Sequence, residues 1–264
     1  MNHKYINYKN TKIHYYEKGK GSTLIFLHGF LENLNMWQPY LDVFSQKHRV
    51  IAIDLLGHGN SECMGYIHTM EDMADTVFAL ISELKLRKIT LLGHSMGGYV
   101  ALAFAELYPD YIKGLALIAS TSRADSPERK VNRDRAIELI KKNNVTFINI
   151  AISNLFGEQE RITYQKQIES TKSETLKMPI QGIIAALEGM KIRADREVIL
   201  HFAPYPIALI TGKKDTVIPY EENITQIADT RVKLTTLSGG HMLHIENTEE
   251  LKVAIQQFIK SNKL

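Results

Sequence analysis

Short apolar runs alternate with amphipathic helical patterns along the first half of the chain. These runs lack the polar alternate positions of a half-exposed strand, so they predict strands that are covered on both faces of a sheet. Strands alternating with helices in this way are typical of βα units in a mainly parallel sheet. The predicted central strands are Leu24–Leu27, Val50–Ile53, Ile89–Leu92 and Leu115–Ile118, and the sheet pattern resumes at Ile207–Ile210 and Val232–Leu237.

Two helices packed on this sheet have recognisable start signals. Thr69 can cap a helix with one apolar face, and Asp72 stands three residues later, which is the spacing of a capping box. Asn247 can cap the last helix of the chain in the same way. Nearer the N-terminus, Ile6–Tyr8 and Lys12–Glu17 predict an antiparallel hairpin of edge strands.

The stretch between Ala119 and Pro206 is far longer than an ordinary connection between two strands, so it must have structure of its own. We interpret it as a helical cap inserted over the sheet. Helical character is present in Ala136–Lys141, Thr146–Leu155, Glu160–Ser170 and Ile180–Arg193. The predicted division is a first core part at 1–121, a helical cap at 122–200 and a second core part at 201–264.

Composition adds exclusions to this picture. The 264 residues are 44% hydrophobic and 23% charged, which is ordinary for a globular protein long enough to bury a full core. No apolar stretch approaches the roughly 18 residues of a membrane span, and the polar start favours a cytoplasmic protein without membrane insertion. The net charge of +3 is too small to predict a nucleic-acid partner. We expect a monomer or homodimer, and Cys63, the single cysteine, predicts neither a disulfide nor a metal site.

The strongest chemical signal is the segment Gly93-His94-Ser95-Met96-Gly97-Gly98. It matches the pattern G-x-S-x-G, follows a predicted strand directly and precedes a predicted helix, which is the context that the motif requires. Glycines at the first and last positions let such a strained turn close without side-chain collision. Ser95 is therefore the candidate nucleophile.

A serine hydroxyl needs a base to take its proton, and the base needs an orienting acid. Asp215 lies in the turn after one late strand, and His241 follows a Gly-Gly pair after the next strand. The order serine, aspartate, histidine is the order found in nucleophile-elbow enzymes. His244 is the rival base, and Asp125, after an earlier strand, is the substitute acid.

The loop after the first central strand is the candidate for the second part of an oxyanion hole. We expect the backbone N–H groups of Phe30 and Met96 to donate to the oxyanion. His28 and Asp54 are interpreted as structural, with Asp54 holding loop amides. Large apolar residues that can line a substrate cleft, or alternatively pack in the core, are Trp37, Phe147, Phe156, Met178 and Met190.

Several separate motifs in this order give the chain its resemblance to the α/β-hydrolase superfamily. They are His28–Phe30, Asp54–Ser61, Gly93–Gly98, Gly212–Asp215 with Pro219, and Gly240–His241 followed by Glu246-Asn247. The resemblance implies a mainly parallel eight-stranded sheet flanked by helices, with a cap over the active site. The form Gly-His-Ser-Met-Gly-Gly is similar to broad-specificity carboxylesterases and monoacylglycerol lipases. A serine nucleophile is unlike haloalkane dehalogenases and epoxide hydrolases, which use aspartate.

The resulting hypothesis is a serine hydrolase that cleaves a small or medium, uncharged carboxylic ester without a cofactor or a metal. A lyase of the menaquinone-pathway type is an alternative, although Tyr99 stands where that enzyme usually has arginine. Basic residues Arg123, Arg129 or Arg193 facing the cleft would support the lyase. A carbon–carbon bond hydrolase often has asparagine where this chain has His94. The remaining alternative is a ligand-binding homologue without turnover.

Overall fold

The computed structural model describes residues 3–264, and within them eight strands form one sheet in the order β1-β2-β4-β3-β5-β6-β7-β8. The strands from β4 to β8 in this order pair in parallel, whereas β2 is antiparallel to both β1 and β4. The mainly parallel eight-stranded sheet is thereby confirmed. The strands are β1 (His3–Tyr8), β2 (Thr11–Lys18), β3 (Thr23–Leu27), β4 (Arg49–Ile53), β5 (Ile89–His94), β6 (Ile112–Ile118), β7 (Ile207–Gly212) and β8 (Lys233–Leu237).

The N-terminal hairpin forms as predicted, through a two-residue turn. Lys9 and Asn10 have φ values of 48° and 63°, and two left-handed residues are what a type I′ turn between twisted strands requires. Of the two hairpin strands, only β1 lies at an edge of the sheet, because β2 also pairs with β4. The expectation that both hairpin strands are edge strands was therefore wrong for β2.

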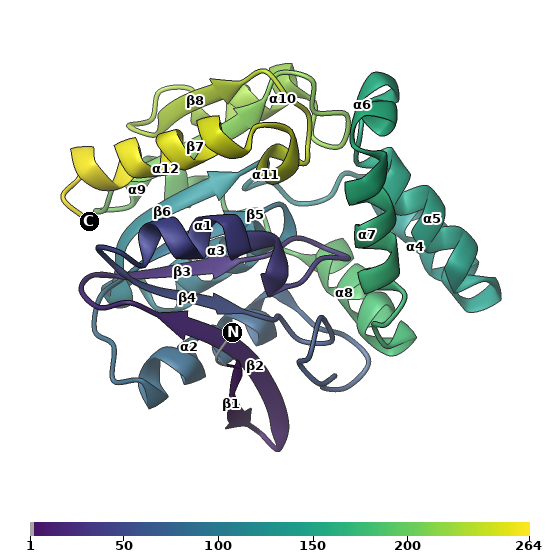
Figure 1. Cartoon of the computed structure of the whole chain (residues 1–264), viewed down its shortest axis with the longest axis horizontal. Coiled ribbons are helices and arrows are strands. Elements are labelled where there is room, and N and C mark those ends of the chain that lie inside the picture. Colours follow the sequence, from purple (N-terminus) through teal and green to yellow (C-terminus); the bar gives the residue numbers. More distant parts are fainter. Residues whose placement is uncertain (1–2) are drawn as a thin grey trace.

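Helices cover both faces of the sheet, which explains why the central strands have no polar face. Leu24 and Phe26 of β3 pack with α1 (Gln38–Phe44) and α12 (Thr248–Ser261), whereas Ile25 and Leu27 pack with α2 (Met70–Glu83) and α3 (Met96–Leu107). Figure 1 shows the sheet between these two layers. Short helical turns in the connections are η1 (Leu34–Trp37), η2 (Pro109–Tyr111), α10 (Tyr220–Ile224), η3 (Thr225–Ile227) and α11 (Leu243–Glu246).

The two predicted helix caps differ in outcome. Thr69 and Asp72 form the full capping box at the start of α2. Asn247 precedes α12, but its side chain makes no capping hydrogen bond there. Instead its Oδ1 accepts from the Gly239 N–H at 2.8 Å and its Nδ2 donates to Ser238. The prediction of an Asn247 cap was wrong because the loop before His241 competes for the same amide group.

Six helices lie between β6 and β7 and form the helical insertion, defined here as residues 127–202. Figure 1 shows most of this insertion, in teal and green, grouped at one side of the sheet. α4 begins at Pro127 rather than Ala136, because Ser126 caps it and Pro127 suits a first turn. The expected helix at 160–170 is broken at Tyr164. The helices are α4 (Pro127–Lys142), α5 (Asn144–Asn154), α6 (Glu158–Thr163), α7 (Gln165–Thr175), α8 (Ile180–Ile192) and α9 (Glu197–Phe202), of which α9 was not predicted.

Among residues 3–264, no helix has both the length and the apolar character that crossing a bilayer demands.

Candidate active site

Ser95 occupies a strained turn between β5 and α3, with φ 49° and ψ −114°. A serine with positive φ is uncommon and indicates a conformation imposed by its surroundings. A Cβ atom on Gly93 would lie 2.3 Å from the Gly97 carbonyl oxygen, and one on Gly97 would lie 2.4 Å from the Leu27 carbonyl oxygen. Both positions therefore require glycine, as the motif predicted. The turn lifts the Ser95 hydroxyl away from the sheet, at the carboxyl end of β5.

Two hydrogen bonds join Ser95, His241 and Asp215, which come from the ends of β5, β8 and β7. His241 Nε2 lies 2.9 Å from Ser95 Oγ, and His241 Nδ1 lies 2.9 Å from Asp215 Oδ2. An ionised carboxylate only accepts hydrogen bonds, so the proton of the neutral imidazole is on Nδ1. His241 Nε2 then carries the lone pair that can accept the serine proton.

Asp215 is held in its charged form. Burial by itself would raise the pKa of this carboxyl, but the facing His241 and two backbone hydrogen bonds lower the pKa below its ordinary value. The backbone donors are the N–H groups of Val217 and Ile218, both 2.8 Å from Oδ1. Because Oδ1 is occupied by these amides, Oδ2 is left to orient the imidazole.

Phe30 and Met96, the expected oxyanion donors, both lie near Ser95: Met96 follows it directly, and Phe30 shares a cavity wall with it. Met96 is the first residue of α3, so its N–H has no partner inside the helix. Within residues 3–264, the Phe30 N–H donates no backbone hydrogen bond. Gly29 beside it comes so close to the elbow that a Cβ there would lie 3.3 Å from Ser95 Cβ. Their role as donors remains a proposal.

Neither rival residue takes the place of its counterpart. Asp125 pairs with Arg133 and Arg193, and both guanidinium groups lie in the helical insertion or at its connections. His244 is buried, and its Nε2 lies 3.3 Å from Glu32 Oε1 rather than at Ser95. Of these candidates, His241 is the histidine within hydrogen-bond distance of Ser95, and Asp215 is the aspartate within hydrogen-bond distance of His241.

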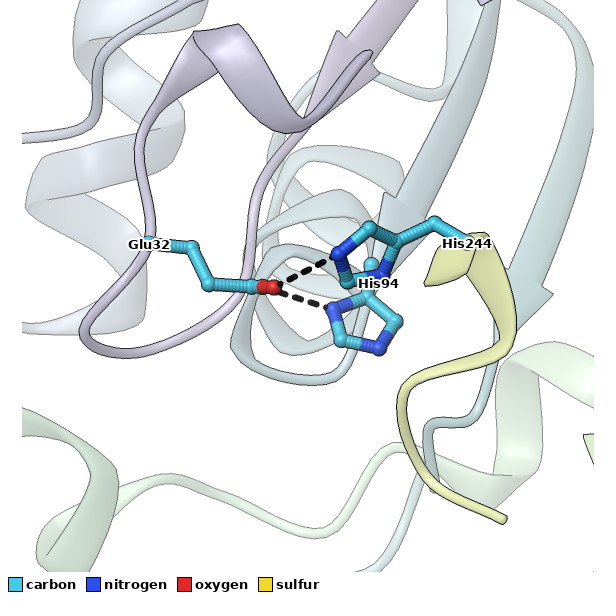
Figure 2. A group of neighbouring side chains, drawn as sticks. All are labelled: Glu32, His94 and His244. Atoms are coloured by element: carbon cyan, nitrogen blue, oxygen red, sulfur yellow. Dashed lines mark hydrogen bonds and ion pairs between the residues drawn. The ribbon is translucent and has the colours of Figure 1, made fainter. Parts of the chain in front are cut away.

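A buried cluster of Glu32, His94 and His244 stands behind the elbow, and sequence reasoning missed it. Figure 2 shows the Glu32 carboxylate reaching both imidazole rings. Glu32 Oε2 is 2.8 Å from His94 Nδ1 and also accepts the Gly29 N–H at 2.9 Å. His94 Nε2 is 3.0 Å from the His241 carbonyl oxygen. The cluster thus connects the loop after β3 to the loop that carries His241.

His94 must be protonated at both ring nitrogens, since each faces an oxygen that only accepts. Burial lowers the pKa of His94, but the Glu32 charge more than offsets this and raises the pKa above its usual value. Burial would raise the pKa of Glu32, and the two imidazoles lower it to about 2. The cluster is the one group in residues 3–264 whose spacing could hold a metal ion. An ion pair of Glu32 and His94 accounts for the charges without one.

His28 and Asp54 have the structural contacts that the sequence predicted. His28 Nε2 accepts the Leu55 N–H at 2.9 Å. Asp54 accepts hydrogen bonds from the N–H groups of Leu34 and Asn60. Its Oδ2 also lies 2.6 Å from His14 Nδ1. These bonds fix the two loops that follow β3 and β4, next to the elbow.

A cavity of about 110 Å³ contains Ser95 and His241 on its wall. Phe30 lines it, and so does Met190, one of the candidate lining residues. The insertion also contributes Arg129, Arg133, Ala151 and Leu155.

Four of the predicted lining residues do not line this cavity. Trp37 is fully buried on the opposite face of the sheet, with its ring 5.2 Å from Phe26. Phe147, Phe156 and Met178 are buried in the core between the insertion and the sheet. These four assignments were wrong because core packing and cleft lining select the same large apolar side chains.

A mainly parallel eight-stranded sheet with a serine elbow after a central strand defines the α/β-hydrolase class. A family model described as alpha/beta hydrolase fold matches residues 22–248. The chain therefore belongs to the α/β-hydrolase family.

Curated relatives and solved structures resemble the chain over nearly its whole length. It is 25% identical to (E)-2-((N-methylformamido)methylene)succinate hydrolase of Acinetobacter baylyi, over 96% of this chain and 95% of that protein. A second relative is the dihydrolipoyllysine-residue acetyltransferase component of the acetoin cleaving system of Pseudomonas putida. The two are 28% identical over 92% of this chain, which spans 65% of that protein. A thermophilic esterase from Thermogutta terrifontis, solved with malate bound, is 31% identical with a TM-score of 0.92 and 99% of both chains covered. Hydrolase chemistry is the class that the family match, the hydrolase of Acinetobacter baylyi and the esterase support.

Proposed function

We propose that this protein is a serine hydrolase that cleaves a small or medium carboxylic ester through an acyl-enzyme. The observation that carries the proposal is the chain of two 2.9 Å hydrogen bonds from Ser95 through His241 to Asp215. The strained backbone of Ser95 supports it, because such a turn exposes the nucleophile in this fold. The cavity of about 110 Å³ suits a short acyl or alcohol group.

In the first half of the reaction, Ser95 Oγ attacks the ester carbonyl carbon while His241 Nε2 takes the hydroxyl proton. The negative charge that forms on the carbonyl oxygen is held by the Phe30 and Met96 N–H groups. The C–O bond to the alcohol then breaks, and the alcohol leaves with the proton from His241. Asp215 keeps the imidazole in the required tautomer and stabilises its charged form.

In the second half, a water molecule gives its proton to His241 Nε2 and attacks the acyl carbon. The bond to Ser95 Oγ breaks, the serine regains a proton from His241, and the carboxylic acid leaves. Every proton is returned, so neither a cofactor nor an external reductant is consumed.

We further propose that the helical insertion acts as a cap that selects the substrate, dividing the chain at 1–121, 122–200 and 201–264. Its support is the set of cavity residues that the insertion supplies, which includes Arg129, Leu155 and Met190. Substitutions at these three positions should change substrate preference more than they change the reactivity of Ser95.

A fluorophosphonate probe tests the nucleophile directly. The wild type should be labelled at Ser95, and Ser95→Ala should show neither labelling nor ester turnover while keeping its circular dichroism spectrum. A folded wild type that resists labelling and hydrolyses no ester would refute the proposal and favour the ligand-binding homologue.

Elimination by a lyase is the second candidate, because Arg129 of the expected basic residues does line the cavity, together with Arg133. Arg123 and Arg193 are not on its wall; Arg193 lies behind Tyr99. Hydroxylamine separates the two reactions, since it intercepts an acyl-enzyme and yields a hydroxamate. Ester turnover without hydroxamate would count for the lyase-like route.

A further inference from the structure

Two arginines project from one face of α4 toward the cavity that contains Ser95. Arg129 and Arg133 are four residues apart, which places their side chains on the same side of a helix. Both line the cavity wall together with Ser95 and His241. A cavity built for an uncharged ester has no use for two guanidinium groups, because each must be partly desolvated there.

Arg133 is only half neutralised by its acidic partner. Its Nε and Nη2 donate to the two oxygens of Asp125. The same carboxylate also accepts from Arg193, whose Nη1 lies 2.5 Å from Oδ1. Burial would raise the pKa of Asp125, but these two arginines lower it, so the carboxylate is charged. Arg193 lies 4.1 Å over the ring of Tyr99, which is itself on the cavity wall. One carboxylate thus serves two cations, and one positive charge is left over.

Arg129 has no acidic partner in residues 3–264: no carboxylate oxygen lies within 4 Å of its guanidinium nitrogens. Its Nη2 donates to the Val217 carbonyl oxygen at 2.7 Å. The N–H of the same residue, Val217, donates to Asp215 Oδ1. Arg129 is therefore held beside the loop of the proposed catalytic acid. A guanidinium group has five N–H donors, so most of them remain available to a ligand.

The acidic side chain on the cavity wall is Glu32, and His94 neutralises it. The insertion side of the cavity therefore carries two net positive charges, one from Arg129 and one from the group of Arg133, Arg193 and Asp125. The same wall also has apolar members, Leu155 and Met190 among them. An anionic group at one end of a short apolar segment matches this distribution.

We propose that Arg129 binds a carboxylate group of the substrate, and that the excess charge beside Arg133 strengthens the attraction. The protein then prefers an ester that carries a carboxylate to a neutral ester of the same size. This inference rests on the proposed function, because it concerns the substrate of the Ser95 site. It replaces the expectation of an uncharged ester with a more specific class.

Two matched pairs of esters test the preference. Monomethyl glutarate and methyl valerate share their leaving group and acyl length, and differ in a terminal carboxylate on the acid side. 4-Acetoxybutyrate and butyl acetate place the same difference on the alcohol side. We expect kcat/KM to be about tenfold to a hundredfold higher for the anionic member of at least one pair, mainly through KM, since charge-assisted hydrogen bonds have this strength.

Arg129→Met keeps the length of the side chain and removes its charge, and should reduce the ratio of anionic to neutral kcat/KM about tenfold or more. Arg135→Met is the matched control. Arg135 lies on the same helix, is exposed, and among described residues its side chain hydrogen-bonds only to Asn132. This variant should leave the ratio unchanged.

Failure of the inference and failure of the proposed function give different results. Hydrolysis of both members of each pair at equal kcat/KM would overturn the carboxylate preference while leaving the hydrolase in place. Hydrolysis of neither member would overturn the proposed function. In that case titration calorimetry of Ser95→Ala with glutarate decides the carboxylate site. Binding that weakens about tenfold when Arg129→Met is added supports the site, and equal or absent binding refutes it.

Discussion

Replacing Glu32 with glutamine should destabilise the folded chain by about 3 kcal/mol. The pKa of this buried carboxyl is lowered from 4.5 to about 2. One unit of difference between the folded and unfolded pKa corresponds to about 1.4 kcal/mol, which gives the quoted size. Breaking a buried ion pair by removing one partner costs a similar amount in other proteins, roughly 3–5 kcal/mol.

Glutamine cannot restore the contacts of Glu32, because one oxygen serves two donors. Oε2 accepts both the Gly29 N–H and the Nδ1 proton of His94. An amide oxygen in this place lacks the charge that keeps His94 doubly protonated. An amide nitrogen could donate to a neutral His94 ring, but it would face the Gly29 N–H. Either orientation loosens the tie between the Phe30 loop and the His241 loop, so kcat should fall as well.

The loss should depend on pH in a way that an uncharged contact would not show. The contribution of Glu32 is complete above its unfolded pKa of 4.5 and disappears as the pH falls through about 2. The pKa of His94 is raised on folding, so its contribution is complete below 6.5 and disappears as the pH rises through the folded value. The difference between wild type and Glu32→Gln should therefore be largest between pH 4.5 and 6.5.

Urea denaturation at pH 6, with repeats at pH 4 and at pH 9, measures this difference. Glu169→Gln is the control, because Glu169 is an exposed partner of Lys172 and its pair should contribute less than about 1 kcal/mol. A loss at Glu32 below about 1 kcal/mol, or one that stays constant over this pH range, would refute the ion-pair interpretation of the cluster.

Three further predictions concern the elbow, the core and the acid. Gly97→Ala should lower the free energy of unfolding by at least about 2 kcal/mol, because the added Cβ would lie 2.4 Å from the Leu27 carbonyl oxygen. An unchanged urea midpoint would contradict this. Trp37→Ala should cost about 3–5 kcal/mol of stability with KM unchanged, and an altered KM would return Trp37 to the cavity wall. Asp215→Asn should reduce kcat about 10⁴-fold while the thermal transition stays similar, and a loss under tenfold would point to another acid.

Some of the site could be predicted because it follows from chain order. Ser95 follows its strand directly, and Asp215 and His241 come a few residues after theirs, each strand being one that the apolar pattern predicts. Parallel strands bring their carboxyl ends to one edge, so the three side chains had to lie near one another if the strands formed one sheet. Glycines 93 and 97 marked the strained turn in the same local way.

Other parts of the site depend on partners distant in the sequence. Glu32 meets His94 across 62 positions, and Asp125 meets Arg193 across 68. Nothing local distinguishes these from the other charged residues of the chain. The insertion was predicted to be helical. Which face of α4 lines the cavity beside Ser95 depends on how that helix packs. The charge of the cavity wall was therefore not accessible from the sequence.

Trp37 and Met190 show where prediction from the sequence ends and the tertiary structure decides. Both are large and apolar, and hydrophobic burial is non-directional, so the sequence specified that both leave water without specifying where. Packing then placed Trp37 in the core with α1 and Met190 on the cavity wall that also contains Ser95. The sequence by itself determined the strands, the elbow and the order of the three candidate catalytic residues, because these arise from local periodicity and backbone geometry. Only the tertiary structure decided what lines the cavity and which charges are neutralised, because both depend on contacts between distant segments.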